Sequence, residues 1–359
     1  MLSNIKKMAI IAISVTIISG ATDATTELPR RQEDATAPRK ERDTVAYTSK
    51  NLTIFLLQSE DTIPRNYLTL EEAMEQKKIV LHETGNVGEL SADNNSSDYI
   101  FIMAGDLVRG GKQDRTIGED IVLAPGYKRA PIKSYCVEED RWGPRGSEPL
   151  AYFTSSHHML NNKALKVAVR IEQSQDRVRE EIADFHSRMN NQMNEDVTNE
   201  ISPTSLLLTL ENEKIKDSIA EYVDALLTAF EDKNDVTGFA FFINGKISTV
   251  ETFGNAALFR MMQRKLLEAA ALEAFEKYDA NIAFQEPTYT DLTFFLEKAE
   301  NETQMSRKTY LDMIECNKKT EHSILLRSVN TDAGMTPLHT SIFATDDLSF
   351  GNIYYDFKS

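Results

Sequence analysis

Apolar and polar residues alternate in short runs over the first half of the chain. Strand-like runs lie at residues 52–57, 79–83, 99–103, 121–123, 132–137 and 165–171. Between them stand residues that favour turns, and one short helix is predicted at residues 69–77, where Thr69 and Glu72 have the spacing of a capping box. Short strands separated by turn signals are typical of an antiparallel sheet, a sandwich or a partly open barrel.

The pattern becomes helical after Ile171. Residues 173–194 are polar and helix-prone, and residues 206–230 repeat apolar positions at helical spacing. An Asn-Gly pair at residues 244–245 stands between apolar runs and predicts a hairpin, which a long Ala/Leu-rich helix at 256–278 follows. Two further strands are expected at 323–329 and 338–344. We therefore predict an α+β fold in which an antiparallel β-rich first half packs with a helical middle and with a unit made of the hairpin and the long helix.

The N-terminus has the pattern of a cleaved signal peptide. Lys6 and Lys7 precede the apolar run Met8–Ile18, and Ser19-Gly20-Ala21 supplies small residues for cleavage. The apolar run is too short to cross a bilayer comfortably, so no stable membrane anchor is expected. The alternative is a buried N-terminal helix. We predict cleavage near Ala21 and export to the periplasm or the extracellular space.

Four segments follow from this organisation. Residues 1–21 are the signal peptide and residues 22–46 a disordered polar leader. Residues 47–172 form the β-rich half. Residues 173–359 form the helical and α+β half, and we expect the two halves to share one continuous fold.

Charge and composition exclude several classes of function. The 359 residues have a formal net charge of −16, which repels phosphate backbones, so no nucleic-acid partner is expected. The six histidines form no metal-binding motif, and Walker A, GxGxxG and GxSxG motifs are absent. We therefore expect no metal and no cofactor. His82 and His339 are interpreted as core or edge residues of strands, and adjacent His157 and His158 would point to opposite faces of a strand.

The two cysteines give no disulfide framework. Cys136 and Cys316 are too few for one, and the sequence leaves open whether they are bridged. Cys136 is interpreted as a packed strand residue because a neighbouring carboxylate raises a thiol pKa, and because no Cys-x5-Arg arrangement of a phosphatase follows it.

Two polar motifs concentrate the chemistry: GGKQDR at residues 110–115 and YCVEEDRW at residues 135–142. A glycine-rich turn with guanidinium groups suits a phosphate or carboxylate, and the single tryptophan suits stacking on a sugar or base. Asp114 and Glu138 are candidates for a catalytic acid and base. The candidate ligand-binding residues are Arg109, Lys112, Gln113, Arg115, Arg141 and Trp142. In the alternative, purely structural interpretation, the arginines pair with Asp114 and Glu138 and join neighbouring strands.

The two motifs also carry a family resemblance. Together with Asn51-Leu-Thr-Ile-Phe, Tyr67-Leu-Thr-Leu-Glu-Glu-Ala and Glu251-Thr-Phe-Gly254, they make residues 51–344 resemble the ARPP-1 family, the ADP-ribosylglycohydrolase and rhodanese-phosphatase-superfamily-associated domain. The resemblance implies a connection with ADP-ribose or phosphate-ester metabolism.

Two functions follow as expectations, and the sequence leaves open whether the protein is an enzyme. The first is an exported binding or accessory protein that recognises a small anionic ligand, or a partner, through the two motifs. The alternative is a hydrolase acting on an ADP-ribose-like or phosphate-bearing small molecule.

Overall fold

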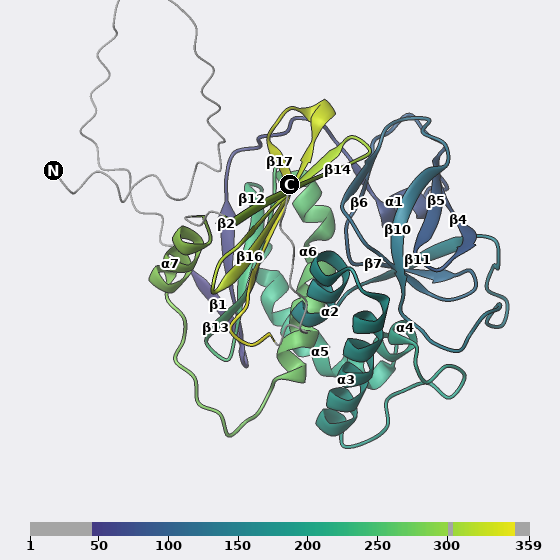
Figure 1. The fold of residues 1–359 in the computed structure, drawn as a ribbon. Helices are drawn as coiled ribbons and strands as arrows, with labels where there is room; N and C mark the ends of the chain where they lie inside the picture. Colours follow the sequence, from purple (N-terminus) through teal and green to yellow (C-terminus); the bar gives the residue numbers. More distant parts are fainter. Residues whose placement is uncertain (1–44, 301–303, 349–359) are drawn as a thin grey trace, which may run out of the picture.

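A computed structural model describes residues 45–300 and 304–348 of the chain (Figure 1). The predicted signal peptide, the leader up to residue 44 and the last residues of the second half, 349–359, lie outside the described residues. Among the described residues, none of the helices combines the length and the apolar character that a membrane crossing requires.

The largest sheet has eight antiparallel strands and draws on both ends of the described chain. Its strands, in spatial order, are β1 (Ala46–Ser49), β2 (Leu52–Gln58), β12 (Val236–Ile243), β13 (Lys246–Phe253), β17 (Pro337–Ala344), β16 (Ser323–Asn330), β15 (Met313–Lys319) and β14 (Gln304–Tyr310). Strand β2 pairs with β12 along most of its length. The N-terminal strands therefore belong to the same sheet as the hairpin β12–β13 that was predicted around Asn244-Gly245.

Two smaller sheets form the β-rich unit at the right of Figure 1. The six-stranded sheet has the order β11 (Phe153–Met159), β7 (Asp106–Gly110), β8 (Arg115–Ile117), β10 (Ala130–Cys136), β5 (Glu89–Asn94) and β4 (Ile79–Asn86). The three-stranded sheet has the order β3 (Leu68–Thr69), β6 (Ile100–Ile102) and β9 (Ile121–Leu123). Buried aliphatic side chains from both sheets share one core, among them Leu81, Leu90, Ile102 and Ile132.

The predicted capping box begins helix α1 (Leu70–Glu75). The Thr69 hydroxyl accepts a hydrogen bond from the Glu72 backbone N–H at 3.2 Å, and the Thr69 backbone N–H donates to the Glu72 carboxylate at 3.0 Å. This local signal was readable from the sequence because both partners lie within one turn of helix.

Helices cover both faces of the large sheet. The long helix α6 (Ala256–Glu276) and helix α5 (Glu213–Leu227) pack on one face, where Phe239, Phe241 and Phe259 are buried together. Helix α7 (Tyr289–Glu300) packs on the other face through Leu292 and Phe295 (Figure 1). Strands and helices are therefore both extensive, and the α+β class predicted from the sequence is confirmed.

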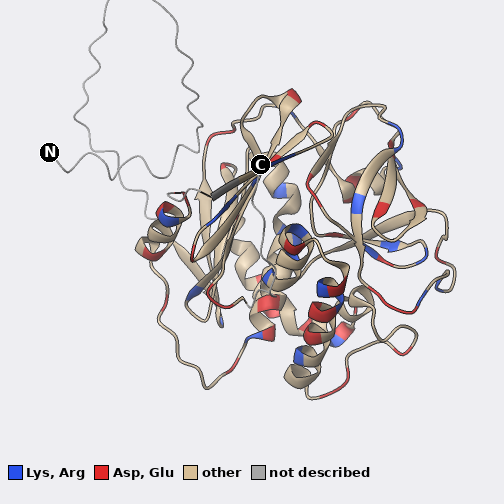
Figure 2. Cartoon of the chain, viewed as in Figure 1, with Lys and Arg blue, Asp and Glu red and all other residues tan. Residues whose placement is uncertain are grey.

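Helix α3 (Gln175–Met193) confirms the predicted polar helix. Its buried side contains Val178, Ile182 and Phe185, and its other side carries charges of both signs (Figure 2). Arg177 pairs with Glu181 one turn later at 2.8 Å, at a spacing that stabilises helices, and Glu181 is buried.

The strand predicted at residues 165–171 is wrong. This segment forms helix α2 (Lys163–Val167), which continues into one π-helical turn (Ala168–Glu172). Leu165, Val167 and Val169 are buried, but so are Lys166 and Arg170, so the helix is enclosed on nearly all sides. A helix that is enclosed on all sides has no periodic pattern of apolar residues by which to recognise it. Its N-cap residue is a better signal, and here the Asn162 side chain accepts a hydrogen bond from the Leu165 N–H at 2.9 Å.

Other differences are local. The helix predicted at 206–230 is divided into α4 (Leu206–Leu210), α5 and a 3₁₀ turn (Thr228–Phe230), because Asn212 caps a new helix. Strand β1 precedes the first strand-like run predicted, at residues 52–57. The sequence did not predict helix α7, strands β14 and β15 or the 3₁₀ turn Thr331–Ala333. Strand β15 has no apolar alternation, and most of its side chains are half-exposed.

Candidate functional site

The two motifs lie side by side in the six-stranded sheet. Strands β8 and β10 pair so that Arg115 stands opposite Cys136. The chain enters β8 through a tight turn in which Gly110 has φ +116° and Gly111 has φ +57°. A Cβ atom on Gly111 would lie 2.4 Å from the Phe153 ring, so only glycine fits this position.

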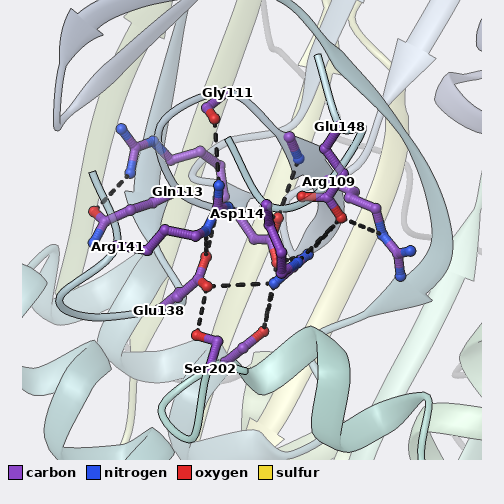
Figure 3. Close-up of polar contacts among 12 residues, drawn as sticks. Arg109, Gly111, Gln113, Asp114, Glu138, Arg141, Glu148 and Ser202 are labelled. Atoms are coloured by element: carbon purple, nitrogen blue, oxygen red, sulfur yellow. Dashed lines mark hydrogen bonds and ion pairs between the residues drawn. The ribbon is translucent and has the colours of Figure 1, made fainter. Parts of the chain in front are cut away.

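The centre of the two motifs is a buried cluster of four charges, Asp114, Glu138, Arg141 and Arg145, called here the ion-pair cluster (Figure 3). Arg141 lies 3.3 Å from Asp114 and 2.7 Å from Glu138. Arg145 lies 2.9 Å from Asp114 and 3.3 Å from Glu138. Each arginine therefore bridges both carboxylates.

Backbone and hydroxyl donors complete the coordination of these carboxylates. Asp114 accepts from the Gly110 N–H at 3.1 Å and from the Ser205 hydroxyl at 3.5 Å. Glu138 accepts from the Ser202 hydroxyl at 2.6 Å and from the Asp114 N–H at 3.2 Å. Each of the four carboxylate oxygens thus has two donors, and the exposed fractions of Asp114 and Glu138 are 0% and 1%.

Burial changes the acidity of the Asp114 carboxyl. It raises the pKa of that carboxyl above its ordinary value, while the nearby Arg145 charge opposes the change. An acid or base must reach the proton that it transfers. In this conformation Asp114 and Glu138 reach only their own arginines, backbone and serine hydroxyls. Arg141 pairs with both carboxylates as the structural interpretation expects, whereas Arg115 pairs with neither. The charges join the ends of β8 and β10 to the loop before α4.

Sequence reasoning missed Arg145, which is as central as Arg141. The loop after β10 returns Arg145 to the cluster and also brings Glu148, whose carboxylate lies 2.8 Å from the Arg145 guanidinium. Arg109 lies at the edge, where it pairs with Glu211 and approaches Glu148 at 3.8 Å. A second arginine four residues after Arg141 was the available signal.

Arg115 lies beneath the surface, apart from the ion-pair cluster. Its side chain has no exposed area, its guanidinium contacts the Cys136 sulfur and lies 3.5 Å from the Gln113 side-chain oxygen, and Glu83 is 3.8 Å away. Burial raises the pKa of the Cys136 thiol, and the Arg115 charge opposes this. Cys136 and Cys316 are both free thiols.

Within the two motifs Trp142 and Asp140 are exposed and Lys112 is partly buried, and Lys112 and Trp142 contact each other. The Trp142 side chain is 52% exposed, and the Lys112 ammonium lies 4.7 Å from the centroid of its ring. The Lys112 backbone is fixed by an N–H···O bond of 3.0 Å to the Glu83 carboxylate. The pair therefore places a partly buried cation over the ring of a half-exposed indole, and we call it the Lys–Trp edge.

A second buried polar cluster was not anticipated. His339 on β17 lies between two carboxylates, with Nδ1 2.7 Å from Asp120 and Nε2 3.0 Å from Glu251. Arg170, from the π-helical turn, lies 3.4 Å from Asp120 and 2.9 Å from Glu315. We call this set, with Lys166, Ser328 and Ser341, the histidine cluster.

The histidine cluster resembles a Ser-His-Asp triad only in outline. Ser341 Oγ lies 3.4 Å from His339 Nε2, and Asp120 accepts at Nδ1. However, Glu251 also accepts from Ser341 and His339. Burial alone lowers the pKa of His339, but the attraction of Asp120 and Glu251 exceeds this effect and raises the pKa to about 9. A protonated imidazole cannot act as the general base that such a triad needs.

Charge balance explains how this cluster is tolerated in the core. Asp120, Glu251 and Glu315 face three cations, which are Arg170, Lys166 and His339. Buried charges persist when they are paired and hydrogen-bonded. The cluster thereby joins β13, β15 and β17 to the segment formed by α2 and the π-helical turn. Glu251 within the Glu251-Thr-Phe-Gly254 sequence was the only signal for it.

The chain has no match among curated proteins or among solved structures. A family model does match, over residues 44–333, and its description is ARG and Rhodanese-Phosphatase-superfamily-associated Protein domain. This range covers most of the 359 residues and contains both motifs and Glu251. The chain therefore belongs to the ARPP-1 family.

Proposed function

We propose that this protein is an exported binding or accessory protein that recognises a small anionic ligand through the Lys–Trp edge. The observation that carries the proposal is the Lys112 ammonium placed 4.7 Å from the ring centroid of the exposed Trp142. The face of the Trp142 indole that Lys112 does not cover can stack on a planar ring, and the Lys112 ammonium can attract a phosphate or carboxylate. A nucleotide or an ADP-ribose-like compound combines these two features.

The ion-pair cluster supports this role as a rigid base. Both motifs reach it, since Asp114 belongs to the first and Arg141 to the second. Trp142 directly follows Arg141, whose guanidinium donates to the Gly143 carbonyl at 2.6 Å. A side chain held on a fixed backbone loses less entropy on binding, which favours affinity.

A hydrolase is the less supported alternative. It requires Asp114 or Glu138 to exchange a proton with a bound ligand, and each of their oxygens already has two donors. Hydrolysis at this site would need the ion-pair cluster to open.

Binding is measurable directly because Trp142 is the single tryptophan of the chain. Titration with ADP-ribose, AMP and inorganic phosphate is expected to change its fluorescence, with ADP-ribose and AMP binding more tightly than phosphate alone. Isothermal titration calorimetry of Lys112→Gln should give affinities at least fivefold weaker, and of Trp142→Ala a larger loss. Incubation followed by chromatography should return the ligand intact.

A matched control comes from helix α7, where Lys298 lies 4.3 Å from the ring centroid of the exposed Phe294. Lys298→Gln removes a lysine in the same kind of pair and should leave affinity unchanged. Equal weakening by both variants would indicate a general charge effect, and unaltered binding in Lys112→Gln would overturn the proposal. Appearance of hydrolysed product would favour the alternative function.

Export is the second part of the proposal and rests on Lys6 to Ala21 alone. N-terminal sequencing of the protein recovered from its native source should begin near residue 22. A mature protein that still begins at Met1 would overturn this part without affecting the ligand proposal.

A further inference from the structure

Helix α1 and strand β11 bring three metal-ligating side chains together. Glu71 and Glu75 are four positions apart on α1, so they share one face of the helix. Strand β11 is at the edge of the six-stranded sheet, and its pairing with β7 is irregular between Ser155 and Met159. Within this bulge His157 has φ +58°, and its Nδ1 contacts the Glu71 carboxylate. The bulge thus directs an imidazole at the acidic face of α1.

The donor atoms are close enough to share one ion. A carboxylate oxygen of Glu71, another of Glu75 and an imidazole nitrogen of His157 all lie within 4.8 Å of one another. Two carboxylates at this range repel each other unless a cation lies between them. The set is mixed, with two oxygens and one nitrogen, and it joins two separate elements.

A cavity on the other side of Glu71 is the second observation. Its volume is about 100 Å³, and its wall includes Glu71, Asp106 and Lys265. The Lys265 ammonium lies 2.6 Å from Asp106 and 3.9 Å from the Glu71 oxygen Oε2, whereas the other oxygen, Oε1, faces His157. Glu71 therefore belongs to the donor set and to the cavity at once. The cavity has room for water or a small anion beside Glu71, and its wall contains neither Glu75 nor His157.

We propose that Glu71, Glu75 and His157 form a three-ligand site for a divalent transition-metal ion such as Zn²⁺. Imidazole with carboxylates suits Zn²⁺, while the hard ions Ca²⁺ and Mg²⁺ prefer sets made of oxygen alone. Three protein ligands leave a coordination position open for water or a small anion. The site lies outside the two motifs and does not depend on the ligand proposed for the Lys–Trp edge.

The sequence did not reveal the role of His157, because His157 and His158 are adjacent and form no metal-binding motif. Side chains of a regular strand would direct His157 and His158 to opposite faces, but the bulge leaves His157 exposed and His158 half-buried. Burial lowers the pKa of His158 to about 4. Glu71 lies 86 residues from His157, so no local sequence motif reveals the set.

Titration calorimetry of the full, tag-free protein with ZnCl₂, MnCl₂, CaCl₂ and MgCl₂ tests the site. One equivalent of Zn²⁺ is expected to bind, more tightly than Ca²⁺ or Mg²⁺. Glu75→Gln and His157→Gln should each weaken Zn²⁺ at least tenfold while the circular dichroism spectrum stays unchanged. A crystal grown with Zn²⁺ should show an anomalous peak among the three side chains.

His322 offers a matched control, since its ring lies 2.9 Å from Asp346 and 3.7 Å from Glu321 on the surface. His322→Gln should leave Zn²⁺ affinity within twofold. Zn²⁺ affinity that is unchanged in both Glu75→Gln and His157→Gln, or absence of Zn²⁺ binding by the unmodified protein, would overturn the site. Neither result bears on the Trp142 titrations.

Discussion

His339 Nδ1 lies 2.7 Å from the Asp120 carboxylate although 219 positions separate the two residues in the chain. The contact ties the C-terminal strand β17 to the turn before β9, and Glu251 holds the other ring nitrogen at 3.0 Å. The imidazole is completely buried, and the two carboxylates favour its charged form, so its protonation is linked to the stability of the fold.

The free energy of unfolding should therefore decrease at alkaline pH. The pKa of His339 is about 9 in the folded protein, against an ordinary 6.5. Because the folded value is the higher one, the stabilisation is complete below pH 6.5 and is lost as the pH rises through 9. The loss is on the order of 3 kcal/mol. Urea unfolding at intervals between pH 7 and 9.5 measures it.

His339→Gln is the control for this pH dependence. It should be less stable than the unmodified protein at pH 7 and nearly level between pH 7 and 9.5. Parallel curves for the two proteins would show that another group causes the decline.

Arg145→Ala should destabilise the protein by about 3–5 kcal/mol, because it leaves Asp114 and Glu138 buried with one arginine fewer. Arg179→Ala removes a surface pair with Glu139, in which the side chains are 37% and 42% exposed, and should cost less than about 1 kcal/mol. Chemical denaturation compares them. Similar losses for both would mean that the ion-pair cluster is better hydrated than its burial indicates.

The two thiols should differ in reactivity. Cys136 is buried and burial raises its pKa, whereas Cys316 is half-exposed. A thiol reagent should modify Cys316 in the folded protein and Cys136 only after denaturation. In Cys316→Ser the reaction of the folded protein should vanish. Rapid labelling of Cys136 would indicate an open, reactive thiol there.

Asn162→Ala should cost about 1 kcal/mol, because the Asn162 side chain caps α2 at the Leu165 N–H. Asn162→Ser keeps a hydroxyl acceptor and should retain part of that stability. Thermal unfolding distinguishes the two variants, and an Ala variant as stable as the Ser variant would contradict the cap.

Local signals predicted local structure well. The capping box at Thr69 and the hairpin at Asn244-Gly245 appear where expected, because their partners are close in the chain. Residues 165–171 were mistaken for a strand because an enclosed helix buries polar and apolar side chains alike. In such a segment the N-cap residue, here Asn162, is the sequence signal that indicates a helix.

The sequence predicted most of the residues of the candidate site, but it did not predict which of them contact one another. The sequence left open whether the charges of the two motifs bind a ligand or one another. In the structure Arg141 meets Asp114 and Glu138, whereas Arg115 lies apart from them. Arg145 returns through a loop, and Ser202 reaches Glu138 from 64 residues away. The histidine cluster depends on contacts between distant strands, which no local pattern encodes.

The strand order of the large sheet has a consequence for synthesis of the protein. β2 leaves the ribosome long before β12, its partner, and must remain unpaired on that side meanwhile. The β-rich unit from β3 to β11 is translated in between, and its sheets contain no strand from outside it. We infer that this unit folds first on the nascent chain, and that β1 and β2 join the large sheet only after β12 has been translated. Pulse proteolysis of chains stalled after residue 200 should find residues 60–160 protected and residues 46–58 cleaved, and the reverse order would refute the inference.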